Sequence, residues 1–272
     1  KQHIAVVIPT IRPESMKKFM ETWRPLFDKH EVKLLIVWDG EKPMVETSGG
    51  KCSVEMIMDK YGDCLTNFNA GIRNLGFAYV AKYLLEVEYI ITLDDDTLPI
   101  SDPIQDHLNA LNRRVPVSWL STASEYMRGF PYGIREEAEV VLSHGVWEGV
   151  ADWDAPTQLV LGPNRPTEFY KGPIPKGVYY PMCSMNLAFK RKMLPYIYHA
   201  PAVLGVNRAN DIFAGIISKR EIDKRGWAVV SGYARVKHER ASNVFKNLQN
   251  EALEIELNEA FWQGDENHPY FK

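Results

Sequence analysis

The sequence predicts an α/β fold in which a mostly parallel central sheet is flanked by helices. In the first 100 residues, short and continuous apolar runs alternate with longer segments of helical spacing. Continuous apolar runs are typical of strands buried on both faces, and alternation of strands with helices implies parallel, right-handed crossovers. A chain of 272 residues is long enough to bury a full core, so we expect one domain over residues 1–272.

Short, mainly apolar segments predict four strands in the N-terminal half: Ile4–Ile8, Leu34–Trp38, Val54–Met58 and Tyr89–Leu93. Helical spacing predicts two helices between them, Glu14–Phe27 and Thr66–Leu85. The second helix carries an apolar stripe of Phe68, Ile72, Leu75, Tyr79 and Tyr83.

The pattern breaks between residues 121 and 181, where Gly, Pro, Trp and Tyr crowd together without a long amphipathic stretch. Long irregular insertions in compact domains are usually functional, so we expect a substrate-binding insertion there. Beyond it the sequence predicts a strand at Asn186–Lys190, a helix at Asp211–Lys224, a strand at Trp227–Val230, a loop containing His238 and a helix at Asn243–Asn258.

Composition excludes several classes of protein. With 45% hydrophobic residues and a net charge of −3, the chain is not mainly disordered. A pI near 6.2 without a dense Lys/Arg cluster argues against nucleic-acid binding. No apolar run approaches the roughly 20 residues that span a bilayer. Cys52, Cys64 and Cys183 form no CxxC pair, which argues against a disulfide framework or a zinc knuckle and favours a cytoplasmic location.

Three adjacent carboxylates, Asp94, Asp95 and Asp96, follow the strand Tyr89–Leu93. Adjacent carboxylates repel one another unless hydrogen bonds or a cation offset the cost. At a strand end, Asp94 and Asp96 share one side while Asp95 points away. Oxygen ligands suit Mg²⁺ or Mn²⁺, which commonly bridge a diphosphate. The alternative is a solvated acidic turn that caps the helix near Ser101.

His238 is a candidate third ligand for the metal, and an imidazole ligand favours Mn²⁺ over Mg²⁺. The alternative is a surface or capping histidine.

The segment from Asn69 to Gly76 contains two glycines and Arg73, which is a candidate partner for a phosphate group. The alternative is that these glycines only allow a helix to pack closely on the sheet. Asp39 either accepts a base or ribose donor or forms a turn with Gly40. Ligands bind α/β sheets at the carboxyl ends of their strands. The further candidates for binding nucleotide or substrate are Thr10, Arg12, Asp95 and Asn186.

The insertion places Arg128 and Arg135 among aromatic residues and glycines. Each is a substrate contact or an arginine stacked on a surface aromatic ring. Asp152 and Asp154 either bind sugar hydroxyls or cap the turn before Pro156. Asp211 either acts in the site or helps Asn210 to cap a helix.

Taken together, these segments resemble the reversibly glycosylated polypeptides, whose plant members include UDP-arabinopyranose mutases. The resemblance runs from VVIPTIRP to FWQ and PYF at the carboxyl end, and includes the DDD, RGFPYGIRE, SHGVW, DWDAPTQ, PMCSMNLAF and NDIFAG segments. It implies a glycosyltransferase-A-type nucleotide-diphosphosugar domain. Ser184 stands where the plant members carry glycine, which bears on the sugar specificity.

The resemblance also implies a mechanism. Asp94, Asp96 and His238 hold a divalent metal on the diphosphate of a UDP-sugar, and Arg128 is glycosylated reversibly, with Arg135 as the second arginine of its motif. Because a guanidinium is protonated at neutral pH, such a step needs a nearby carboxylate, for which Asp152, Asp154 and Asp211 are the candidates. The sugar ring then opens and recloses between its pyranose and furanose forms.

Three functions remain open at this point. The first is a metal-dependent UDP-pentose mutase that glycosylates itself. The second is a glycosyltransferase with an external acceptor bound beside Trp147 and Trp153. The third is a nucleotide-sugar-binding subunit, against which the retained DDD, Arg128 and Arg135 argue. The expected partner is a UDP-sugar, with no nucleic acid and no membrane span, and a homo-oligomer stays open.

Overall fold

A computed structural model describes residues 3–58, 68–120, 126–162, 168–200, 209–239 and 243–264. Its strands are β1 (Ile4–Thr10), β2 (Lys33–Trp38), β3 (Met44–Thr47), β4 (Gly50–Ser53), β5 (Tyr89–Leu93), β6 (Thr97–Pro99), β7 (Arg114–Val115), β8 (Ala138–Gly149), β9 (Gly172–Ile174), β10 (Asn186–Lys190) and β11 (Ala228–His238). Its helices are α1 (Pro13–Lys29), α2 (Val54–Met58), α3 (Arg73–Tyr83), α4 (Pro103–Leu111), α5 (Ala155–Leu161), α6 (Asn210–Lys224) and α7 (Val244–Gln263), with the 3-10 turns η2 (Ala70–Ile72), η3 (Tyr132–Ile134) and η4 (Arg191–Tyr196).

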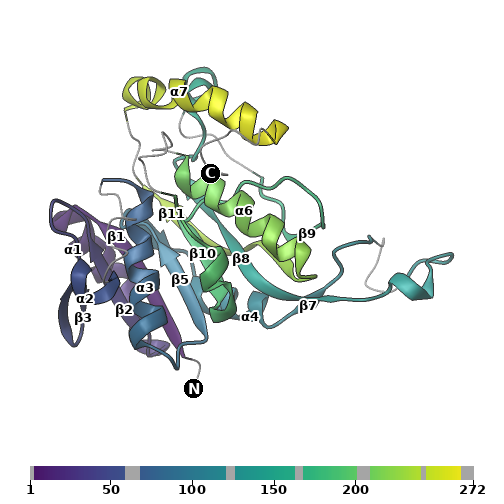
Figure 1. Ribbon diagram of the computed structural model, residues 1–272, viewed down its shortest axis with the longest axis horizontal. Helices are drawn as coiled ribbons and strands as arrows, with labels where there is room; N and C mark the ends of the chain where they lie inside the picture. Colours follow the sequence, from purple (N-terminus) through teal and green to yellow (C-terminus); the bar gives the residue numbers. More distant parts are fainter. Residues whose placement is uncertain are drawn as a thin grey trace.

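The described strands form one connected sheet, whose main path runs β4-β3-β2-β1-β5-β10-β8-β11-β6 (Figure 1). β1 pairs in parallel with β2 and β5, and β8 pairs in parallel with β11. β10 is antiparallel to both β5 and β8, so β2, β1, β5, β8 and β11 all run in one direction. This arrangement confirms the predicted α/β class with a mostly parallel central sheet.

Helices cover both faces of the sheet because the central strands are apolar on both sides. On one face Ile4, Val6 and Ile8 of β1 pack with α1 and α4 in a single core cluster. On the other face Ala5 and Val7 pack with α3. A third, smaller cluster joins α6 to α7, in which Phe213 and Phe261 stack with ring centroids 4.6 Å apart.

The common direction of the central strands gathers their carboxyl ends at one edge of the sheet. Thr10 ends β1, Asp39 follows β2, Asp94 follows β5, Val150 follows β8, and His238 ends β11. Functional side chains that are far apart in the sequence therefore meet along this edge.

Several element predictions need correction. Val54–Met58 is the short helix α2, not a strand, because a five-residue segment interrupted by Glu55 is ambiguous and only Ile57 is buried there. Beyond β2, the sheet is continued by β3 and β4, which the sequence did not predict. His238 ends the long strand β11 instead of lying in a loop, because β11 continues past Gly232 through a register shift against β8.

The predicted helix Thr66–Leu85 begins later than expected. Asn69 accepts a hydrogen bond from the amide of Gly71 at 2.7 Å and starts η2, after which α3 runs from Arg73 to Tyr83. Phe68 and Tyr83, at the two ends of the expected stripe, are exposed. Thr66 lies outside the described residues.

The segment 121–181 is less irregular than predicted. It contains β8, a 12-residue strand in the middle of the sheet, and the short helix α5. Polar residues and two glycines interrupt the apolar pattern of β8, which hides it in the sequence. Gly145 is required there because a Cβ atom would lie 2.1 Å from Asn186 Nδ2.

No helix in the described part of the chain is long and apolar enough to cross a membrane. Cys52 and Cys183 are free thiols, and Cys64 lies outside the described residues.

We expect Gly76→Ala to destabilise the fold by about 1–3 kcal/mol, because α3 lies directly on the sheet at this position. An added Cβ would come within 2.5 Å of Val7 Cγ1 and 2.9 Å of Val37 Cγ2. Urea unfolding followed by tryptophan fluorescence measures the loss. Gly133→Ala is the matched control, because a Cβ there meets nothing within 4 Å; equal stability of the two variants would contradict the packing argument.

Candidate functional site

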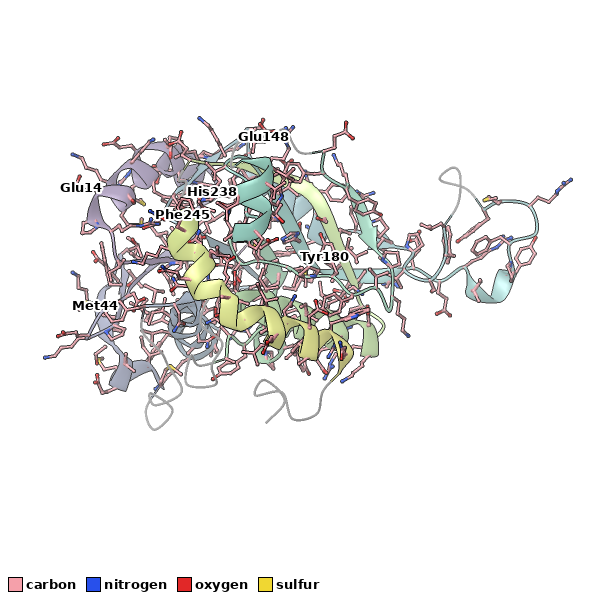
Figure 2. The ribbon with its side chains drawn as sticks, turned by 90° about the horizontal axis from the view of Figure 1, so that it is seen from above. Glu14, Met44, Glu148, Tyr180, His238 and Phe245 are labelled. Carbon is pink, nitrogen blue, oxygen red and sulfur yellow. The ribbon has the colours of Figure 1, made fainter. Side chains whose placement is uncertain are left out.

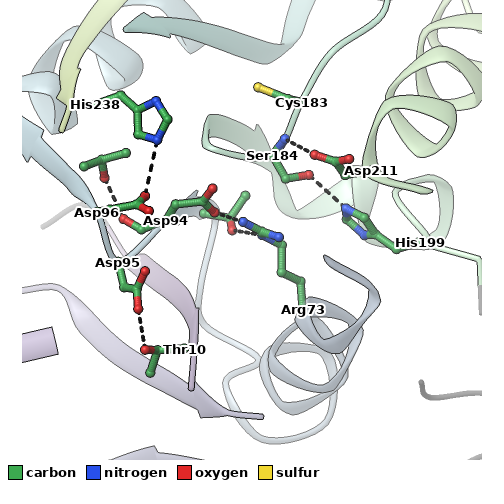
Figure 3. A network of polar contacts seen from close by, with 12 residues as sticks. Thr10, Arg73, Asp94, Asp95, Asp96, Cys183, Ser184, His199, Asp211 and His238 are labelled. Carbon is green, nitrogen blue, oxygen red and sulfur yellow. Dashed lines mark hydrogen bonds and ion pairs between the residues drawn. The ribbon is translucent and has the colours of Figure 1, made fainter. Parts of the chain in front are cut away.

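The acidic turn after β5 separates its three carboxylates, as the sequence predicts (Figure 3). Asp95 points toward the end of β1, whereas Asp94 and Asp96 lie on the opposite side of the chain. The turn is closed by Thr97, whose amide and hydroxyl both donate to the carbonyl oxygen of Asp94. Each carboxylate therefore has its own surroundings, which reduces their mutual repulsion.

Asp95 is buried and binds the end of β1. It accepts a hydrogen bond from Thr10 Oγ1 at 2.5 Å and from Arg12 Nε at 3.1 Å, and Arg12 Nη2 forms an ion pair with its second oxygen. Arg12 Nη2 also reaches Asp96 Oδ2 at 3.1 Å. Thr10, Arg12 and Asp95 thus act in this structure as the scaffold that fixes the acidic turn.

Asp94 faces Arg73, the first residue of α3. Its Oδ1 pairs with Arg73 Nη2, and Arg73 Nε donates to Thr92 Oγ1 at 3.1 Å. The Arg73 side chain is only 5% exposed, so its charge is held in place beside the acidic turn. A fixed cation next to a carboxylate suits a site that receives an anionic group.

Asp96 faces His238 across the edge of the sheet. Asp96 Oδ1 is buried without a hydrogen-bond partner among the described residues, and it lies 3.8 Å from His238 Nε2. Burial, and next the neighbouring Asp94, raise the pKa of Asp96. The other ring nitrogen of His238, Nδ1, bonds the carbonyl oxygen of Val150 at 2.9 Å.

The chemistry of this pair fits a divalent cation. A carbonyl acceptor on Nδ1 fixes the imidazole tautomer and leaves Nε2 as a lone-pair donor, as in metal-binding histidines. The unpartnered oxygen of Asp96 is a second donor facing the same space. Within the described part of the chain, no three His, Cys, Asp or Glu side chains are already gathered as a metal cluster, because Asp94 is turned toward Arg73.

A cavity of about 910 Å³ opens beside this pair. Asp94, His238 and Arg73 line its inner side. Carboxylates dominate the charge of the lining, which also includes Asp152, Asp154, Asp211, Glu251 and Glu254. Aromatic rings of Phe68, Trp153 and Tyr179 complete the wall. A volume of this size accommodates a nucleotide-sized ligand.

Helix α7 forms one wall of the cavity and carries lining residues that the sequence analysis missed. Figure 2 shows α7 beginning beside His238 and running across this face of the molecule. Its lining residues recur at helical spacing and are Asn247, Asn250, Glu251, Glu254, Ile255 and Asn258. The sequence does contain a signal for this wall, because Asn and Glu recur every three or four residues and so give the helix a continuous polar face.

Asp211 lies at the first turn of α6 and lines the cavity. Ala209 occupies the N-cap position, so Asp211 is not a capping residue; its Oδ2 accepts the amide of Ser184 at 3.3 Å. Ser184 Oγ lies 2.8 Å from His199 Nε2 (Figure 3). Burial raises the pKa of Asp211 to about 6 and lowers the pKa of His199 to about 3, so His199 is neutral.

Other predicted binding residues have structural partners. Both oxygens of Asp39 accept backbone amides, of Gly40 and Phe68, at 2.7 Å each, which supports the turn interpretation. Asp154 lines the cavity but also caps α5 through the amide of Thr157 at 2.9 Å. Asp152 is exposed in the cavity wall.

Asn186 is corrected from a substrate contact to a structural residue. It is fully buried between strands, where its Nδ2 donates to the carbonyl oxygens of Val146 and Ala234 and its Oδ1 pairs with His107. All its polar atoms are therefore used inside the fold.

Arg128 and Arg135 are not brought to the cavity. They lie on residues 126–137, named here the arm, which projects beyond the edge of the sheet and contains η3 (Figure 1). Arg135 stacks on Tyr132 and Tyr126, at 3.8 Å and 4.3 Å from the ring centroids, and donates to the Phe130 carbonyl oxygen. The stacked-arginine interpretation therefore holds for Arg135. Arg128 is exposed and, among the described residues, makes no hydrogen bond or ion pair.

The fold and the site define an α/β protein with a charged cavity at the carboxyl edge of its sheet. Residues 1–265 match the family described as "Reversibly glycosylated polypeptide", and the chain belongs to that family. It is 32% identical over 300 residues both to UDP-arabinopyranose mutase 3 of Arabidopsis thaliana and to the probable UDP-arabinopyranose mutase 1 of Pisum sativum. Each alignment covers 100% of this chain and 78% of the relative.

Among solved structures, the catalytic domain of Drosophila β1,4-galactosyltransferase 7 in complex with xylobiose aligns with 90% of this chain and 79% of that chain. The sequence identity is 11% and the TM-score is 0.39.

We expect Asp211→Asn to stabilise the EDTA-treated protein at pH 8. The folded-state pKa of about 6 lies above the ordinary 3.8, so the ionised carboxylate opposes folding above pH 6, and this cost disappears as the pH falls toward 4. A shift of this size corresponds to about 1–3 kcal/mol, because solvent in the cavity screens part of it.

Chemical unfolding at pH 8 and pH 4.5 measures the difference between variant and wild type. Asp154→Asn keeps the helix cap at an exposed position and serves as the matched control. A variant whose stability gain is the same at both pH values would show that ionisation of Asp211 is not the cause.

Proposed function

We propose that the chain is a UDP-pentose mutase that interconverts the pyranose and furanose forms of the sugar through reversible glycosylation of Arg128. The observation that carries the proposal is the charged cavity at the sheet edge, in a chain whose full length aligns with proteins named UDP-arabinopyranose mutases. UDP-arabinose is the substrate that those names suggest.

The charge balance of the cavity supports a requirement for a divalent metal. Arg73 is the single arginine or lysine among the described lining residues, against six carboxylates. A UDP-sugar adds further negative charge, so a cation has to accompany it. Asp96 and His238, with Asp94, are the residues that would hold the metal, which when bound neutralises charge on the diphosphate and leaving group. Mn²⁺ suits the mixed nitrogen and oxygen donors, and Mg²⁺ is the alternative.

The chain's own residues then orient and capture the sugar. Arg73 presents its fixed charge toward the cavity and stabilises the departing UDP. A nitrogen of Arg128 bonds to C1 of the sugar as the C1–O bond breaks, and the bonding electron pair leaves with UDP. The guanidinium is protonated at neutral pH, so one proton passes to a carboxylate. Asp211, Asp152 and Asp154 line the cavity and are the candidate acceptors.

A second function, transfer of sugar to an external acceptor, is favoured by one observation. Arg128 does not line the cavity, whereas the half-buried Trp153 does, and an indole in the cavity wall is a suitable platform for an acceptor sugar. Trp147 packs instead against the core beside α4.

Metal binding is tested first with His238→Ala. Loss of this donor should weaken Mn²⁺ binding at least about tenfold, measured by electron paramagnetic resonance of free Mn²⁺. His3→Ala is the matched control, because His3 precedes β1 at the opposite edge of the sheet. Unchanged affinity in His238→Ala would exclude this histidine as a ligand.

The mutase proposal is tested by incubating the protein with Mn²⁺ and UDP-arabinopyranose. We expect intact-mass spectrometry to show one anhydropentose adduct, reversed by UDP, and chromatography to show UDP-arabinofuranose. Arg128→Gln should abolish both products, whereas Arg225→Gln, which removes an arginine stacked on the surface ring of Tyr196, should leave them unchanged.

Two results would contradict the mutase proposal. Adduct and furanose at wild-type levels in Arg128→Gln would exclude Arg128 as the nucleophile. Absence of an adduct in the wild type, with UDP released only when an acceptor sugar is added, would establish the transferase instead.

A further inference from the structure

The arm and the cavity lie at opposite ends of β8. The base of the arm is held by β7, whose Val115 and Arg114 pair with Ala138 and Glu139 at the beginning of β8. Val150, directly after the other end of β8, lines the cavity. Ala138 and Val150 are twelve positions apart, and a strand rise of about 3.3 Å per residue separates them by about 40 Å.

The arm holds a compact conformation of its own. Trp119 packs against Tyr126 and Phe130, with ring centroids 5.1 Å and 5.0 Å apart, and Arg135 stacks on the outside of this cluster. Ala138 is ten positions after Arg128, and ten fully extended steps span at most about 36 Å. Arg128 would therefore reach the cavity of its own chain only with the ring cluster broken and η3 unwound.

The outer surface of the arm is apolar around the exposed Arg128, while two exposed carboxylates, Glu136 and Glu137, lie where the arm meets β8. Met127, Tyr132 and Ile134 are 44%, 86% and 47% exposed, beside the exposed Arg128. Large exposed apolar side chains on a projecting segment mark an interaction surface. Figures 1 and 2 both show this segment extending away from the body of the molecule.

We propose that two copies of this chain exchange arms, so that Arg128 of one copy enters the cavity of the other. This inference rests on the proposed function, which requires Arg128 at C1 of the sugar. The charges are complementary, since Arg128 would enter a cavity with an excess of carboxylates. Exposed Phe68 in the cavity wall offers an apolar contact for the arm. A two-fold axis lets both arms dock at once and closes the assembly.

The glycosylation step keeps its balance in this arrangement. The new bond joins Arg128 of one copy to C1 of the sugar held by the other copy. The C1–O bond breaks, its electron pair leaves with UDP, and the guanidinium proton passes to a carboxylate of the copy that holds the sugar.

Co-expression of two inactive variants tests the exchange. One chain carries Arg128→Gln and keeps its cavity; the other carries Asp94→Asn with Asp96→Asn and keeps Arg128. Different affinity tags allow the mixed assembly to be purified, and each variant alone should form no adduct with Mn²⁺ and UDP-arabinopyranose. In the mixed assembly we expect the pentose on the Asp94/Asp96 variant chain, with about one active cavity per two chains.

The outcomes separate this inference from the proposed function. A wild type that forms no adduct refutes the proposed function itself. A wild type that forms the adduct, with mixed assemblies that form none, refutes the exchange of arms. A wild type that sediments as a monomer under conditions where it forms the adduct refutes it as well. Circular dichroism of each variant verifies folding, and His238→Ala, which removes a proposed metal ligand outside the acidic turn, replaces the double variant if that turn fails to fold.

A surface variant provides an independent test. Tyr132→Ser should shift the protein toward monomers in analytical ultracentrifugation and lower adduct formation at least tenfold at low protein concentration. Leu85→Ser is the control, because Leu85 is 72% exposed but lies outside the arm. Dimers and adduct at wild-type levels in Tyr132→Ser would contradict docking through the arm.

Discussion

The repulsion between three consecutive carboxylates at the end of β5 is the constraint around which this site is built. Such a cluster persists only where each charge has a partner of its own. Asp94 is paired with Arg73, Asp95 is tied to the end of β1 by Thr10 and Arg12, and Asp96 faces His238. β1, β5, β11 and α3 are joined at one point by these interactions.

The direction of the strands determines what else reaches that point. Because the five parallel strands end at the same edge, the loops after β8 and the first turns of α3 and α6 converge on one cavity. Helix α7 closes the cavity from outside and is anchored by the stacked rings of Phe213 and Phe261. The same geometry places the beginning of β8, and with it the arm, at the far edge of the sheet.

The cavity therefore carries an excess of negative charge and lacks Arg128, the nucleophile that the proposed chemistry needs. A metal at Asp96 and His238 and an arginine from a second copy would both supply positive charge where a UDP-sugar and several carboxylates meet. The metal and the arginine would each reduce the repulsion between the UDP-sugar and the carboxylates of the cavity. Metal binding and assembly would then favour the same bound state.

The sequence by itself determined the α/β class, most of the N-terminal strands and the opposite orientation of Asp95 relative to Asp94 and Asp96. These features follow from apolar periodicity and from the alternation of side chains along a strand, which are local properties. It did not reveal β8, because the glycines and polar residues of this strand are required by contacts with neighbours such as Asn186. It also did not reveal that α7 forms a polar wall of the cavity. Tertiary structure alone decided that Asn186 is structural and that Arg128 lies far from the cavity. Both depend on which distant strands become neighbours, and no local pattern records that.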